Sequence, residues 1–450
     1  MKLASAINNG LRNGMGPMSE GTIGDIRGYQ IFDSRGWPTL AVEVLLASGK
    51  SGLAMVPAGA STGSREAREL RDGGSAFSGR GVTQAVKVID DIIRPRLVGA
   101  DATQQEELDG ALIALDGTAD KARLGANTIL GVSLAAARAA AEAVHLPLYR
   151  YWSGSSKSLL LPTPQFNVIN GGLHADSGIP VQEFLIIPGG ASSFAEAMQM
   201  GTEVYHALGQ RLRRAGHRTA VGDEGGYAPR IGDIHQVFEV LLQSMEDAGL
   251  TPGVDAALGI DVAASSLWNG KVYQWGTEQL TADQVIDRYI AWIRTYPLVS
   301  IEDGLAEDDW AGWQLMTALL GEHCQIVGDD IFVTQMPYVQ RGIEARSANA
   351  VLVKLNQVGT VTETRQLVNL AHGSGWNTVV SHRSGETVDT SLAEFAVAVG
   401  ALQVKSGAPA RGERLAKYNR LLLMEAHDAS LGFAGWSWRR SAWGRFSADS

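Results

Sequence analysis

Six short apolar runs recur in the second half of the chain, and each ends in a charged or polar residue followed by a loop. Such runs, separated by amphipathic stretches, are typical of buried parallel strands joined by crossover helices. The runs are ALGID, LVSIED, QIVGDD, AVLVK, TVVSHRS and LQVK, which carry Asp261, Glu302, Asp329, Lys354, His382 and Lys405 at or near their ends. Polar residues at the carboxyl ends of successive strands mark the catalytic face of a (β/α) barrel. The pattern therefore predicts three acids and two lysines around one barrel mouth.

The stretches between these runs have a helical period. Residues 281–296 place five apolar side chains on one stripe behind a capping residue, Thr281. Residues 360–374 begin at Thr360 and end next to glycine. Strand and helix therefore alternate, and crossovers of this kind favour parallel strand pairing.

The first third of the chain has a different order of elements. Strand-like pieces over 23–57 precede helical patterns over 81–145, which indicates an α+β unit. The short polar stretch YWSGSSKS separates this unit from the barrel pattern. We therefore expect an α/β protein with a (β/α)8-type barrel after a smaller α+β domain. The divisions are a disordered N-terminal tail (1–22), an N-terminal lid or capping domain (23–152), a barrel catalytic domain (153–435) and a C-terminal tail (436–450).

Composition narrows the class of protein. The 450 residues suit a barrel of about 250 residues plus a second unit. A net charge of −10 argues against a nucleic-acid surface, but it allows local basic clusters around a small anionic substrate. The single cysteine, Cys324, excludes an internal disulfide. Because we find neither a signal peptide nor an apolar run of the ~20 residues that span a bilayer, we expect a cytoplasmic protein.

Three acids are candidate metal ligands. Asp261, Glu302 and Asp329 end three different predicted strands, so they can meet at one rim despite their separation in sequence. Three carboxylates with water suit a hard divalent cation, and Mg2+ is the default. The alternative is that these acids cap neighbouring helices or pair with surface lysines. Side-chain alternation is consistent with inward Asp261 and Glu302, but it does not choose between Asp329 and Asp330.

Two lysines are candidates for a catalytic or binding role. A lysine such as Lys354 acts as a base only if its neutral form is favoured, which nearby cations achieve through like-charge repulsion. A metal ion and a second lysine, Lys405, would do this together. The alternative is that each is an ordinary solvated lysine at a strand end, which is the commoner case for any single lysine.

The SHRSGE segment offers a compact set of donors. His382, Arg383 and Ser384 suit a phosphate group, because arginine has a planar fork of N–H donors and serine has a hydroxyl. The alternative is an ordinary loop tied to an acid.

Three glycine-rich segments carry further polar residues. They are GASTGSRE with Ser61, NGGLHA with His174 followed by Gln182 and Glu183, and GDEGG with Glu224. The first is consistent with a mobile lid, but a turn before a helix is the simpler interpretation. Asn-Gly and Glu-Gly pairs form turns, so by themselves the other two segments read as turns.

Together these segments resemble enolase, the 2-phosphoglycerate dehydratase family of glycolysis. The resemblance runs from about Ile23 to Glu425 and keeps the family order of motifs. The motifs include FDSRGWPT, GASTGSREA, LGANTILGVSLA, NGGLHAD, QEFLIIP, VGDEGGYAP, SIEDG, VGDDIFVT, LVKLNQVGT, SHRSGET and KSGAPARGERLAKYN. So many ordered matches are highly specific for this family and its barrel.

The resemblance implies roles for the matching residues. Asp261, Glu302 and Asp329 would hold one Mg2+, and Ser61 would help to hold a second that arrives with substrate. Lys354 would remove the proton from carbon 2, and Glu224 would assist departure of the hydroxyl from carbon 3. The substrate-binding residues would be His174, Gln182, Glu183, His382, Arg383, Ser384 and Lys405. The reaction would interconvert 2-phosphoglycerate and phosphoenolpyruvate plus water, in a homo-oligomer that is a dimer or an octamer.

Four departures from the family pattern leave other functions open. Trp37, Ala58, Ser266 and Val388 replace residues that are usual in the family, although none is an implied ligand, base, acid or phosphate contact. One alternative is an enolase-like paralogue that acts on a related phosphorylated or phosphonate acid, such as a carboxyphosphonoenolpyruvate synthase. Another is a non-catalytic binding or scaffold protein, which a missing ligand or base would favour; none is missing.

Overall fold

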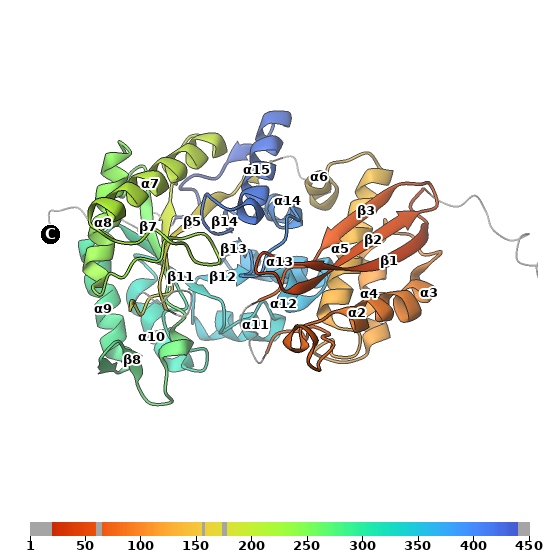
Figure 1. Cartoon of the computed structure of the whole chain (residues 1–450), viewed down its shortest axis with the longest axis horizontal. Coiled ribbons are helices and arrows are strands. Elements are labelled where there is room, and N and C mark those ends of the chain that lie inside the picture. The colour runs from red at the N-terminus through yellow and green to blue at the C-terminus, as the bar shows by residue number, and fades with distance from the viewer. Residues whose placement is uncertain (1–19, 60–64, 155–157, 173–177, 440–450) are drawn as a thin grey trace, which may run out of the picture.

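The computed structural model describes residues 20–59, 65–154, 158–172 and 178–439. In Figure 1 a small sheet with its helices lies at one end of the molecule and a closed barrel at the other. The expected N-terminal tail falls almost entirely outside the described residues. No helix in the described ranges is long and apolar enough to cross a membrane.

The first unit is a three-stranded antiparallel sheet packed on helices. Its strands lie in the order β1 (Ile23–Phe32), β2 (Pro38–Leu46) and β3 (Ser51–Met55). The alanine-rich α5 (Ala126–Ala143) packs on β2 and β3, where Gly52 has no room for a Cβ beside the backbone of Ala135 and Ala139. The other helices of this unit are α2 (Thr83–Val88), α3 (Arg94–Leu97), α4 (Gln105–Asp116) and α6 (Leu148–Ser153), and η2 (Ile89–Ile93) joins α2 to α3.

The second unit is a closed barrel of eight strands. In chain order they are β5 (Thr163–Asn170), β6 (Glu183–Ile187), β7 (Ala257–Asp261), β10 (Leu298–Glu302), β11 (Gln325–Gly328), β12 (Ala350–Val353), β13 (Asn377–Ser381) and β14 (Gln403–Lys405). The six apolar runs form β7 and β10 to β14, and these strands pair in parallel as predicted. The barrel expectation is confirmed.

One strand departs from uniform parallel pairing. β6 runs antiparallel to both of its neighbours, β5 and β7. Its first residue, Glu183, therefore lies beside Asp261, the last residue of β7. β6 is not one of the six apolar runs, and its reversal brings Glu183 to the rim where the other strands end.

Helices surround the barrel (Figure 1). They are α7 (Phe194–Arg214), α8 (Ile234–Asp247), α9 (Ala282–Thr295), α10 (Trp310–Leu320), α11 (Met336–Ala345), α13 (Val361–Gly373), α14 (Ser391–Ala398) and α15 (Gly412–His427). Two predicted caps are confirmed. The Thr281 side chain accepts from the backbone N–H of Gln284 in a capping box, and the Thr360 side chain accepts from that of Glu363.

The segment after β15 (Gly432–Phe433) covers the end of the barrel opposite the acidic strand ends. Trp438, which we assigned to a C-terminal tail, is 2% exposed and packs with Ile187, Ala257 and Val299. Its carbonyl accepts a hydrogen bond from the Asn377 side chain at 2.9 Å. The tail assignment therefore began too early, because an indole ring that closes the bottom of a barrel is part of its core.

Replacing Trp438 by alanine should lower the free energy of unfolding by about 3 kcal/mol, because it leaves a cavity in the barrel floor. Urea unfolding followed by circular dichroism measures this. Because the ring lies at the opposite end from the strand-end acids, chemistry at that rim should be unchanged. A loss below about 0.5 kcal/mol would show that the ring contributes little to the core.

Candidate active site

A cluster of buried acids surrounds one ammonium group at the barrel rim. The Nζ of Lys405, at the end of β14, lies 2.8 Å from Asp261 Oδ2, 2.8 Å from Glu302 Oε1 and 3.1 Å from Glu183 Oε2. All four residues are buried. The pairing of Glu302 with Asp261 explains why both point inward, since residues in register on adjacent strands face the same side.

The second lysine lies at a separate carboxylate. Lys354 follows β12 and places its Nζ 2.5 Å from Asp329 Oδ2. Both Asp329 and Asp330 line the cavity, and Lys354 contacts Asp329. The backbone N–H groups of both aspartates donate to Asp303, at 2.8 and 2.9 Å. Asp303 was not among the predicted site residues, although the doublet with Glu302 was a visible signal.

Charge and burial compete at these groups. Burial raises the pKa of Glu302 well above its ordinary value, and the Asp261 carboxylate raises it further. Burial disfavours the charged form of Lys405, but Asp261, Glu183 and Glu302 outweigh it and raise the pKa of this lysine well above its ordinary value. Burial likewise works against charged Lys354, yet the Asp329 carboxylate raises its pKa.

The donor set fits a hard divalent cation. Asp261, Glu302 and Asp329 bring carboxylates from three strands or strand ends to one rim. Among the described residues, Glu302 Oε2 and Asp329 Oδ1 are buried oxygens that have no hydrogen-bond partner. Buried carboxylate oxygens without partners are costly unless a cation or donor satisfies them. The oxygens therefore match the ligand preference of Mg2+.

The loop after β13 carries the predicted phosphate donors. His382, Arg383 and Ser384 are all buried and line the same cavity as the acids. The guanidinium of Arg383 is held by Glu66, with Nη1 2.9 Å from Oε2, and by Asn356 at 3.1 Å. Glu66 is a site residue that sequence reasoning missed. Its signal was an acid at the end of GASTGSRE.

The GDEGG segment contributes a buried glutamate. Glu224 is 4% exposed, and its Oε2 accepts from Asn167 Nδ2 at 3.2 Å. Gly226, two residues after Glu224, has no room for a Cβ, because that atom would lie 2.6 Å from Asn167 Oδ1. Burial raises the pKa of Glu183 well above its ordinary value, and the neighbouring Glu224 raises it further. Two buried carboxyl groups in contact favour sharing a proton.

One cavity of about 260 Å³ unites these groups. Its lining includes the predicted residues Gln182, Glu183, Glu224, Asp261, Glu302, Asp329, Lys354, His382, Arg383, Ser384 and Lys405. The other two predicted residues, Ser61 and His174, lie outside the described residues. A further lining residue is Ser266, one of the four departures from the family pattern.

The other three departures do not line the cavity. Ala58 forms a β-bridge with Gly385, in the loop that carries the phosphate donors. The Trp37 ring lies under the Arg80 guanidinium, 4.5 Å from ring centroid to Cζ. Val388 is 59% exposed. Of the four, only Ser266 lines the cavity.

Comparison with known proteins identifies the family to which this chain belongs. The family model for the enolase N-terminal domain matches residues 23–152, and the model for the enolase C-terminal TIM barrel domain matches residues 158–441. A protein named Enolase from Acidothermus cellulolyticus is 52% identical over 407 residues, which cover 90% of this chain and 95% of that relative. The chain therefore belongs to the enolase family of carbon–oxygen lyases, the phosphopyruvate hydratases.

Proposed function

We propose that this chain is a Mg2+-dependent lyase that interconverts 2-phosphoglycerate and phosphoenolpyruvate plus water. The observation that carries the proposal is the meeting, in one cavity, of a three-carboxylate cluster, two separately held lysines and a buried glutamate pair. Proton removal next to a carboxylate needs a base and concentrated positive charge, and loss of hydroxide needs an acid. The family membership supports the same reaction.

The metal ligands would be Asp261, Glu302 and Asp329, with Ser61 assisting a second ion that arrives with substrate. When bound, Mg2+ would offset the second negative charge that forms on the substrate carboxylate after carbon 2 loses its proton; this device is known for enolase-superfamily sites. Lys405 would add positive charge beside that carboxylate.

Lys354 is proposed to take the carbon 2 proton. Its side chain is partly buried and its Nζ contacts the Asp329 carboxylate in the cavity, so the lysine is held in place before substrate binds. A lysine can act as base only in its neutral form, which additional positive charge in the cavity favours by repulsion. The electron pair of the broken C–H bond then forms the double bond between carbons 2 and 3.

Glu224 is proposed to give a proton to the hydroxyl that leaves carbon 3, so that water departs. The contact with Glu183 supports this role, because burial and like charge keep a proton on the pair. Arg383 and Ser384 would bind the phosphate, and His382, His174 and Gln182 would complete the lining. The resemblance also supports a cytoplasmic homo-oligomer, either a dimer or an octamer, as part of the proposal.

A second candidate is an enolase-like paralogue that uses the same chemistry on a related phosphorylated or phosphonate acid, such as carboxyphosphonoenolpyruvate formation. The observation that favours it is Ser266, a departure that lines the cavity itself. A changed lining residue alters which acid fits without removing the base, acid or metal ligands.

Purified protein with millimolar Mg2+ is expected to convert 2-phosphoglycerate to phosphoenolpyruvate, as the ultraviolet absorbance of the product reports. Chelation with EDTA should lower the rate, and added Mg2+ should restore it. Calorimetric titration with Mg2+ provides a readout that is independent of turnover. Normal Mg2+ binding with no turnover of 2-phosphoglycerate would favour the paralogue over the glycolytic enzyme.

A further inference from the structure

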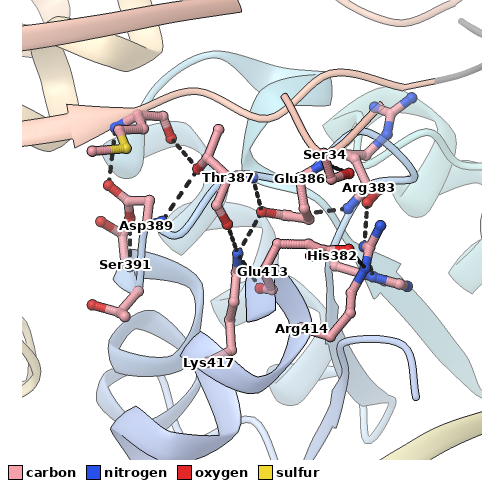
Figure 2. Close-up of polar contacts among 12 residues, drawn as sticks. Ser34, His382, Arg383, Glu386, Thr387, Asp389, Ser391, Glu413, Arg414 and Lys417 are labelled. Atoms are coloured by element: carbon pink, nitrogen blue, oxygen red, sulfur yellow. Dashed lines mark hydrogen bonds and ion pairs between the residues drawn. The ribbon is translucent and has the colours of Figure 1, made fainter. Parts of the chain in front are cut away.

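Arg414 contacts the loop that carries the proposed phosphate donors, and within that loop it contacts one side chain, that of His382. It stands in the first turn of α15 and is fully buried. Its Nη1 contacts His382 Nδ1 at 2.5 Å and donates to the carbonyl of Arg383 at 2.7 Å. Its Nη2 donates to the carbonyls of Ser384 and Asp223, at 2.6 and 3.2 Å. Figure 2 shows the Arg414 side chain pointing toward His382 and the loop that follows it.

The contact with His382 determines which ring nitrogen carries hydrogen. A guanidinium group has N–H donors and no acceptor, so the Nδ1 atom that meets Arg414 must be the acceptor. Burial lowers the pKa of His382 well below its ordinary value; Glu224 opposes this, and Arg414 adds to it. A neutral imidazole whose Nδ1 accepts carries its hydrogen on Nε2.

The hydrogen on Nε2 faces the proposed acid. His382 Nε2 lies 3.5 Å from Glu224 Oε2, the same oxygen that accepts from Asn167 Nδ2. When two N–H groups point at the same oxygen of a protonated carboxyl group, that oxygen is the one without the hydrogen. A proton on Glu224 is therefore carried by Oε1.

We infer that Arg414 is a positioning residue for the dehydration step: it holds His382 as the Nε2–H tautomer, which keeps the proton of Glu224 on Oε1. The inference rests on the proposed function only where it concerns dehydration; the tautomer itself is a property of the protein. Arg414 is not among the residues that line the cavity, and it acts through His382.

The same helix offers a matched control. Lys417 lies one turn along α15, is 1% exposed, and its Nζ contacts Glu386, the carbonyl of Thr387 and the carbonyl of Glu413. Through Glu386 and Thr387 it secures the same loop as Arg414 (Figure 2), but none of these three contacts is with the imidazole ring. A purely structural role for Arg414 predicts that losing either cation has the same effect.

The first test uses the unmodified full-length protein. Histidine labelled with 15N distinguishes the tautomers by NMR, because a nitrogen that carries hydrogen and one that accepts resonate far apart. The His382→Gln variant assigns the signal. We expect Nδ1 as acceptor and Nε2 bearing hydrogen at neutral pH. The opposite tautomer, or a charged ring, would overturn the inference whether or not any variant folds.

The second test compares Arg414→Met with Lys417→Met, each checked for folding by circular dichroism. Arg414→Met should populate the Nδ1–H tautomer and slow dehydration about 10²-fold, the lower range for a general acid, while exchange of the carbon 2 proton continues. Lys417→Met should leave the tautomer unchanged. Equal tautomer shifts in both variants, or parallel loss of exchange and dehydration in Arg414→Met, would reduce Arg414 to a structural residue. Wild-type protein that lacks turnover would overturn the proposed function, while the NMR result would still decide the tautomer.

Discussion

Lys354→Ala is expected to abolish exchange of the carbon 2 proton of 2-phosphoglycerate with solvent, with a loss of about 10⁴-fold or more in rate. The Nζ of this lysine lies 2.5 Å from Asp329 and inside the cavity that the other proposed catalytic groups line. No other described lysine lines that cavity except Lys405, whose Nζ is surrounded by three carboxylates on the opposite strands. Incubation in deuterated water followed by proton NMR measures the exchange.

Lys405→Met is the matched control for the base. It removes the other ammonium group that lines the same cavity, but we expect it to weaken substrate binding and raise KM more than it slows exchange at saturation. If Lys354→Ala kept exchange while Lys405→Met lost it, Lys405 and not Lys354 would be the base. Mg2+ titration of both variants shows whether either change acts through the metal ligands instead.

Glu224→Gln is expected to block dehydration by about 10²- to 10⁴-fold while exchange at carbon 2 stays detectable. The amide has the size of the carboxyl group and can still accept from Asn167, but it cannot give a proton to the leaving hydroxyl. Phosphoenolpyruvate formation and deuterium incorporation, measured on the same sample, separate the two steps.

The variant Glu183→Gln supplies a comparison for this acid. It removes the like charge that helps to keep a proton on the pair, so we expect the pH at which dehydration is fastest to move toward acid while the step itself survives. Equal loss of exchange and dehydration in Glu224→Gln would contradict the division of labour between Lys354 and Glu224.

Much of the fold could be predicted because its signals are local. The runs that became β7 and β10 to β14 are continuous apolar segments, and Thr281 and Thr360 are caps with partners three residues away. The strand-end residues follow from the same pattern, since the carboxyl ends of parallel strands meet at one rim. The departures from the family pattern could also be read from the sequence, although the place of Ser266 in the cavity lining could not.

Other features depend on contacts between distant segments. A strand that is buried on both faces, such as FLII in β6, has the same pattern in either direction, so its reversal and the position of Glu183 could not be predicted. The contact between Lys354 and Asp329 also joins segments that are far apart in the sequence. The burial of Trp438 could not be predicted either, because its ring packs against residues from three different strands.

The chemistry-bearing residue types and their order along the chain are thus set by the sequence, as is the alternation of strand and helix that brings most of them to one rim. Only the folded chain decided which partner each group received. Glu66 meets Arg383 across 317 positions, and Arg414 meets His382 across 32, where a helix buries a cation against a ring. Helical periodicity tells which face of α15 is buried, but what that face touches is settled by packing, because partners come from elements that no local pattern connects.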